Sequence, residues 1–138
     1  FVLGAQGGAF PKMRMIACCG LGGRVGHGRQ GISWLHIDDM TRLIVRAIVN
    51  DSMQGAYIAS APNPVSHTEF MRELRRGIGM PIGLPATELM VRFGAHWLLR
   101  TDPELVLYGR YCVSRRLEEE GYEFAFANIK DAMKDLCR

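Results

Sequence analysis

The stretch GISWLHIDDMTRLIVRAIVN, residues 31–50, decides the fold class of this 138-residue chain. Residues 32–37 are rich in β-branched and aromatic side chains, which predicts a strand, and Asp38 stands where the N-cap of a helix is expected. The helix is predicted by one apolar stripe, whose face we expect to be buried: Met40, Leu43, Ile44, Ala47 and Ile48. A strand that leads directly into an amphipathic helix is typical of an α/β protein.

The next segment predicts a further strand and a second helix. Residues 55–61 read as a buried strand, which Pro62 and Pro64 bring to an end. Ser66 and Glu69 form a capping box, in which each side chain satisfies a free backbone donor at the start of a helix. We expect the apolar stripe of that helix to be Phe70, Met71, Leu74 and Ile78.

Helices predominate in the rest of the chain. The pattern predicts a helix over residues 89–98, a helical start over 101–104, and a half-buried strand over 122–126. Ser114 predicts the cap of a short helix that Gly121 closes, and Asn128 predicts the cap of the last helix. The stripe of that last helix is Ile129, Ala132, Met133, Leu136 and Cys137. We therefore expect parallel pairing in a first part, residues 1–64, and a mostly helical second part, residues 65–138.

Composition excludes several classes of protein. An apolar content of 48%, a charged content of 22% and a mean hydropathy near zero are typical of a folded globular chain. The net charge of +3 does not indicate a nucleic-acid partner, and no apolar run is long enough for a membrane span. The four cysteines lack Cys-x-x-Cys spacing, which favours buried free thiols in a reducing compartment, so we expect a cytoplasmic protein.

Residues 20–31 are dominated by glycine and predict a loop. Within it, Gly26 to Gly31 matches the Gly-x-Gly-x-x-Gly pattern of dinucleotide-binding loops. That pattern requires a strand before it and a helix after it, whereas here a loop precedes and a strand follows, so we do not expect a cofactor phosphate here. Arg14, Arg24 and Arg29 could meet an anion, although a solvated basic loop is favoured.

Catalytic and metal signatures are weak. His36 and Asp38 could form a metal pair or a catalytic couple, but no third ligand stands nearby, and a cap at Asp38 beside a hydrogen-bonded His36 is favoured. No Gly-x-Ser-x-Gly occurs. The Tyr-x-x-x-Lys pair of short-chain dehydrogenases is also absent, since Tyr111 is followed at that spacing by Arg115. We therefore assign no catalytic and no metal-binding residue.

Several stretches together resemble one family. They are residues 2–4 with Gly7-Gly8, 21–23, 28–30, 33–39 and 61–65. These resemble the C-terminal half of extended short-chain dehydrogenase/reductases, in the epimerase-like subgroup sometimes labelled cell-division inhibitor. Residues 117–136 are similar to the small C-terminal domain of unknown function that marks this subgroup.

The resemblance implies the C-terminal part of a Rossmann-like NAD(P)-binding fold with a mostly helical substrate-side subdomain. In this family the cofactor fingerprint and the Tyr-x-x-x-Lys pair lie upstream of the position of Phe1, so the chain alone is expected to be inactive and to bind neither NAD nor NADP. In relatives that act on nucleotide sugars, the loop at Arg24 and Val25 contacts the base. The arginine that holds the diphosphate in those relatives is replaced here by Ile32.

We therefore expect the substrate-binding C-terminal portion of an NAD(P)-dependent nucleoside-diphosphate-sugar epimerase/dehydratase-like oxidoreductase. Its substrate-side residues are Arg24, Val25 and Gln30, since an amide and a cation beside flexible glycines can orient a small, sugar-like ligand. The alternative is a non-catalytic protein-interaction or ligand-binding module. The chain opens at Phe1 without Met, which suggests a strand cut from a Rossmann half. We expect strand edges near Phe1 and Tyr57 that are exposed, or paired with that half or a second copy.

Overall fold

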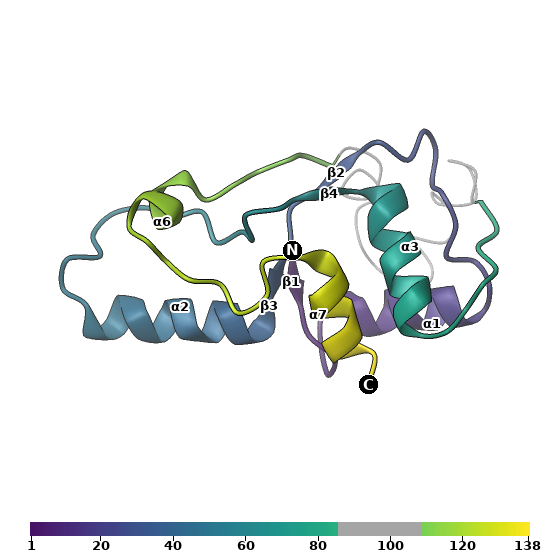
Figure 1. Ribbon diagram of the computed structural model, residues 1–138, viewed down its shortest axis with the longest axis horizontal. Helices are drawn as coiled ribbons and strands as arrows, with labels where there is room; N and C mark the ends of the chain where they lie inside the picture. Colours follow the sequence, from purple (N-terminus) through teal and green to yellow (C-terminus); the bar gives the residue numbers. More distant parts are fainter. Residues whose placement is uncertain (86–108) are drawn as a thin grey trace.

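The computed structural model describes residues 1–85 and 109–138, so the helix predicted over 89–98 and the helical start over 101–104 lie outside the described residues. Its helices are α1 (Phe10–Cys18), α2 (Ile37–Val49), α3 (His67–Gly77), α6 (Arg115–Glu119) and α7 (Ile129–Leu136). Its strands are β1 (Val2–Leu3), β2 (Gly31–Ile32), β3 (Leu35–His36) and β4 (Val65–Ser66) (Figure 1). The fold is mixed α/β, as predicted.

The strands form two separate pairs. β1 runs parallel to β3, with Val2 opposite Leu35, and β2 runs antiparallel to β4, with Ile32 opposite Val65. Residues 1–64 thus contain one parallel pair, β1 with β3. The single strand predicted over 32–37 is divided, because Ser33 leaves the ladder and its hydroxyl donates to the backbone oxygen of Arg110 at 2.7 Å. Phe1 and Val2 are exposed at the edge of β1, as expected.

Helix α2 is confirmed, but its predicted cap is wrong. The N-cap is His36, whose Nδ1 accepts a hydrogen bond from the backbone N–H of Asp38 at 3.2 Å. The imidazole can do this because its neutral form carries one acceptor nitrogen. Asp38 and Asp39 then lie in the first turn, where negative charge favours the helix dipole.

The apolar stripe of α2 is not buried in this chain, contrary to our prediction. Leu43 is buried, whereas Ile44 and Ile48 are 48% and 73% exposed. Figure 1 shows the reason, because α2 extends away from the group formed by α1, α3 and α7. The described residues therefore leave one long apolar helix face uncovered.

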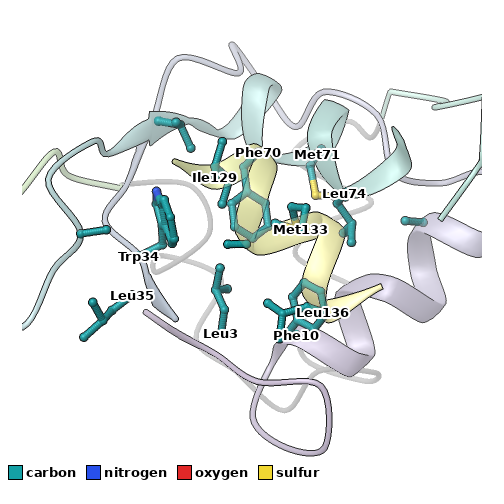
Figure 2. Close-up of a cluster of buried hydrophobic side chains, with 14 residues drawn as sticks. Leu3, Phe10, Trp34, Leu35, Phe70, Met71, Leu74, Ile129, Met133 and Leu136 are labelled. Atoms are coloured by element: carbon teal, nitrogen blue, oxygen red, sulfur yellow. The ribbon is translucent and has the colours of Figure 1, made fainter. Parts of the chain in front are cut away.

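The core lies where α3 packs on α7 and α1 (Figure 2). The predicted stripes of α3 and α7 supply buried residues to this core: Phe70, Met71, Leu74, Ile129, Ala132, Met133 and Leu136. The capping box is confirmed at the Ser66 hydroxyl, which accepts from the N–H of Glu69 at 3.2 Å. Asn128 is the N-cap of α7 as predicted, although its side chain makes no capping bond and instead accepts from Asn63.

Helix α1 was not predicted from the sequence, and two predicted strands are not formed. Residues 55–61 have no ladder partners among the described residues. The N–H of Ala61 donates to the backbone oxygen of Trp34 at 2.7 Å, and the N–H of Ser60 donates within the segment, to the oxygen of Ile58 at 3.1 Å. Over 122–126, the N–H groups of Ala125 and Phe126 donate to the Asp39 carboxylate, at 2.8 and 2.9 Å. A buried side chain thus replaces a neighbouring strand. Ser114 precedes α6 as predicted, without a capping bond from its side chain.

The four cysteines are free thiols, but they are not buried as predicted. Cys18 and Cys19 are exposed, and Cys112 and Cys137 are half-buried. Partial burial raises the pKa of the Cys137 thiol. Among the described residues, no helix has the length and apolar character needed to cross a membrane.

Candidate functional site

The glycine-rich loop, residues 20–30, rests on the N-terminus of α3. The N–H of Thr68 and its hydroxyl both donate to the backbone oxygen of Gly28, at 3.1 and 2.9 Å, and the N–H of His67 donates to the oxygen of Gln30 at 2.9 Å. Gly28 has φ +72° and lies against Thr68 and Arg24, so any larger residue there would be strained and would collide. The loop is therefore fixed to the helix.

These contacts show whether the Gly-x-Gly-x-x-Gly pattern of the loop can bind the phosphates of a dinucleotide. A phosphate at a helix N-terminus binds the free N–H groups of the first turn. In α3 the N–H groups of His67 and Thr68 are used by the loop and that of Glu69 by Ser66, and the loop continues into β2 rather than a helix. The residues present do not fit NAD or NADP at this glycine pattern.

The predicted substrate residues are only partly brought together. Gln30 is buried, and its Nε2 donates to the backbone oxygen of Val25 at 3.1 Å, which closes the loop on itself. Val25 is also buried. Arg24 is exposed, and its side chain packs closely against Gly28: a Cβ added to that glycine would lie 2.5 Å from the Cγ of Arg24. Of the three, only Gln30 lines the pocket described next.

A pocket of about 370 Å³ lies between this loop and the chain that leads to α6. Its lining residues come from two segments distant in sequence: His27, Arg29, Gln30 and Gly31, and Gly109, Arg110 and Tyr111. The second segment was missed from the sequence. The only signal for it was a glycine followed by a cation and a phenol, too common a pattern to single out.

Hydrogen bonds between side-chain hydroxyls and the backbone hold the two walls of the pocket close together. The Tyr111 hydroxyl donates to the oxygen of Arg29 at 2.9 Å, and the Ser33 hydroxyl accepts from the N–H of Cys112 at 2.7 Å. A Cβ on Gly31 would lie 2.6 Å from the backbone carbon of Arg110. Only glycine lets the walls approach so closely, which explains Gly31 by packing rather than by cofactor binding.

His67 is a buried titratable group at the start of α3, where its backbone N–H holds the glycine-rich loop. Burial lowers the pKa of this histidine to about 4, because the charged form is poorly solvated there. Its Nδ1 is buried without a hydrogen-bond partner. His67 is therefore neutral near pH 7 and serves as a packing residue at the start of α3.

We expect the protein to lose stability as the pH falls from 6.5 to about 4, since the unfolded chain binds a proton at His67 in this range and the folded chain does not. The contribution reaches about 3 kcal/mol at the acid end. Urea denaturation of His67→Gln should show a weaker pH dependence between pH 7 and pH 4.5, whatever its stability at pH 7. The exposed His27→Gln serves as the matched control; equal slopes in both variants would contradict the assignment.

His36 and Asp38, which were considered as a metal pair or a catalytic couple, lie at the start of α2, where His36 has a structural role. His36 caps α2, its ring stacks on Phe126 with centroids 3.9 Å apart, and its Nε2 lies 3.5 Å from Asp135 Oδ2. No group of side chains suited to a metal ion occurs among residues 1–85 and 109–138. These contacts join β3, the 122–126 segment and α7.

Comparisons with known proteins agree with this fold. A family model described as a domain of unknown function, DUF1731, matches residues 86–136. The chain is 35% identical over 137 residues to the chloroplastic epimerase family protein SDR39U1 homolog of Arabidopsis thaliana, covering 99% of this chain and 38% of that protein. It is 33% identical to mouse epimerase family protein SDR39U1, covering 98% of this chain and 45% of the relative.

Two solved structures are similar. The crystal structure of human epimerase family protein SDR39U1 (isoform 2) with NADPH has a TM-score of 0.87 and 27% identity, covering 99% of this chain and 45% of that one. A nucleoside-diphosphate sugar epimerase from Corynebacterium glutamicum has a TM-score of 0.69 and 27% identity, covering 96% of this chain and 23% of that one.

The chain thus spans less than half the length of these relatives. It matches their C-terminal part and contains the DUF1731 region. The chain is therefore similar, over nearly its whole length, to the C-terminal part of SDR39U1-type epimerase family proteins, and it carries the DUF1731 region that marks that part.

Proposed function

We propose that this chain is the substrate-binding C-terminal portion of an NAD(P)-dependent oxidoreductase similar to nucleoside-diphosphate-sugar epimerases and dehydratases. The observation that carries the proposal is the likeness, over 99% of this chain, to a human protein solved with NADPH. That ligand favours NADP over NAD as the cofactor. In this proposal an N-terminal Rossmann half holds the cofactor, since the glycine pattern of this chain does not fit it.

The uncovered face of α2 supports a second half. Its exposed residues follow a helical spacing along one side of the helix: Ile37, Ile44, Val45, Ile48 and Val49. Large contiguous apolar surface on a folded protein marks a contact with another element or chain. In our proposal, residues 1–64 complete the sheet and helices of the Rossmann half, and residues 65–138 form the substrate side.

The chain supplies substrate contacts rather than catalytic groups. Arg24, Val25 and Gln30 remain the proposed substrate-side residues, and we place the sugar-like ligand against the glycine-rich loop. The catalytic Tyr-x-x-x-Lys pair belongs to the N-terminal half in this account. We also propose a cytoplasmic location, which the free thiols support; the Arabidopsis relative is named chloroplastic.

Titration with NADPH tests the proposal. The protein encoded by the full reading frame should bind NADPH with a micromolar or lower Kd, and its Tm should rise with NADPH concentration by mass action. The chain of residues 1–138 should show neither effect. A full-length protein that does not bind NADPH, or a chain that binds it equally well, would overturn the proposal.

The exposed face of α2 also favours one alternative function, a non-catalytic interaction module that buries this face against a partner protein. The same titration separates the two. An interaction module predicts a full-length protein whose Tm does not respond to NADPH.

A further inference from the structure

The pocket between the glycine-rich loop and residues 109–111 carries an unusual balance of charge. Arg29 and Arg110 line it from opposite segments, and none of the lining residues that the structure describes is acidic. Neither arginine forms an ion pair with the acidic side chains that the structure describes. Within residues 1–85 and 109–138, two guanidinium groups thus border one concave site and no acidic side chain pairs with either of them.

The same pocket offers a hydrogen-bond donor from a histidine. The Nδ1 of His27 accepts from the N–H of Arg29 at 3.0 Å, so Nε2 is the ring nitrogen that carries the N–H. This leaves the Nε2–H of His27 as a donor beside two cations. A site that combines cationic side chains and hydrogen-bond donors, and has no carboxylate among its described residues, is suited to bind an anion.

The backbone of both pocket walls is held in place by specific hydrogen bonds. Both walls are fixed by side-chain hydrogen bonds across about eighty residues of sequence, from Tyr111 to Arg29 and from Ser33 to Arg110. The positions from which the two arginine side chains extend are therefore set by the fold. Pre-organisation of this kind lowers the entropic cost of binding a ligand.

We propose that Arg29 and Arg110 form an anion site that binds a phosphate group of the ligand. A phosphate ester carries close to two negative charges at pH 7 and matches two guanidinium groups both in charge and in bidentate geometry. This inference deepens the proposed function and rests on it for the identity of the ligand as substrate. The phosphate contact itself depends only on the pocket.

Binding of inorganic pyrophosphate to the full-length protein, measured by titration calorimetry, tests the site. Arg29→Gln and Arg110→Gln should each weaken pyrophosphate binding by about tenfold or more, the loss expected for one charge-assisted contact. The matched control is Arg115→Gln, an exposed arginine outside the lining, which should bind within twofold of the wild type. Arg110→Lys keeps the charge without the planar fork and should bind with intermediate affinity.

Several outcomes would overturn the proposal. Equal pyrophosphate binding by all variants would remove both arginines from the site. If the dicarboxylate malonate binds as tightly as pyrophosphate, the site has no preference for phosphate. Because Arg110 lies in a structural wall, NADPH binding and circular dichroism of each variant are measured as well. A parallel loss of NADPH binding in correctly folded variants would place the site on the cofactor side.

The outcome also separates this inference from the proposed function. If pyrophosphate binding depends on the two arginines as expected but the full-length protein does not bind NADPH, the proposed function is wrong and the phosphate site is still supported. A protein that binds NADPH but shows no arginine-dependent pyrophosphate binding would keep the function and overturn the site.

Discussion

Replacement of Asp39 by alanine is expected to lower the free energy of unfolding by about 3 kcal/mol, which is among the largest effects of any single change in this chain. The Asp39 side chain is fully buried at the start of α2. Its two oxygens accept from the N–H groups of Ala125 and Phe126. Alanine would leave these two donors without a partner, and the 122–126 segment would lose its anchor to α2.

Two further variants separate this anchor from a general effect of charge. Asp39→Asn retains size and one acceptor oxygen but turns an NH₂ group toward a backbone donor, so we expect a loss of about 2 kcal/mol. Asp38→Asn changes the exposed neighbouring carboxylate in the same helical turn and should cost less than about 1 kcal/mol. Urea denaturation measures all three. Similar losses in the Asp38 and Asp39 variants would contradict the anchor.

Local sequence signals predicted those elements whose partners lie within the chain. The capping box at Ser66 and the stripes of α3 and α7 were recognised because their side chains act within a few residues or face one common core. The start of α2 was misplaced by two residues, because a histidine can replace the usual oxygen cap with a ring nitrogen. A residue scale of cap preference does not anticipate that exchange.

Long-range contacts account for what sequence reasoning missed. The strand predicted over 122–126 has the right alternation, yet its donors bind the carboxylate of Asp39, more than eighty residues away. Likewise, Gln30 was proposed as a substrate residue from its polar amide beside glycines, whereas Arg110 becomes part of the same pocket only through folding. Neither contact leaves a periodic signal in the sequence.

The second large effect is expected on the face of α2. In the full-length protein, the double substitution Ile44→Lys and Ile48→Lys should lower the free energy of unfolding by about 4 kcal/mol or more, since it removes two apolar contacts and buries two charges. In the chain of residues 1–138 both side chains are largely exposed. The same double substitution there should change stability by about 1 kcal/mol at most.

The matched control retains the apolar surface. Ile44→Val and Ile48→Val together remove only two methylene-sized groups from the same positions. We expect this pair to cost about 2 kcal/mol or less in the full-length protein. The comparison distinguishes a buried contact from a change in helix propensity, since lysine is the better helix former of the two replacements.

The measurement that tests the account most directly is therefore equilibrium unfolding of the lysine double variant in both lengths of protein, with NADPH binding followed alongside. We expect a large loss of stability and of NADPH affinity in the full-length protein and almost none in the chain of residues 1–138. Equal, small effects in both would show that no N-terminal half covers α2, and would contradict the claim that this chain completes a cofactor-binding protein.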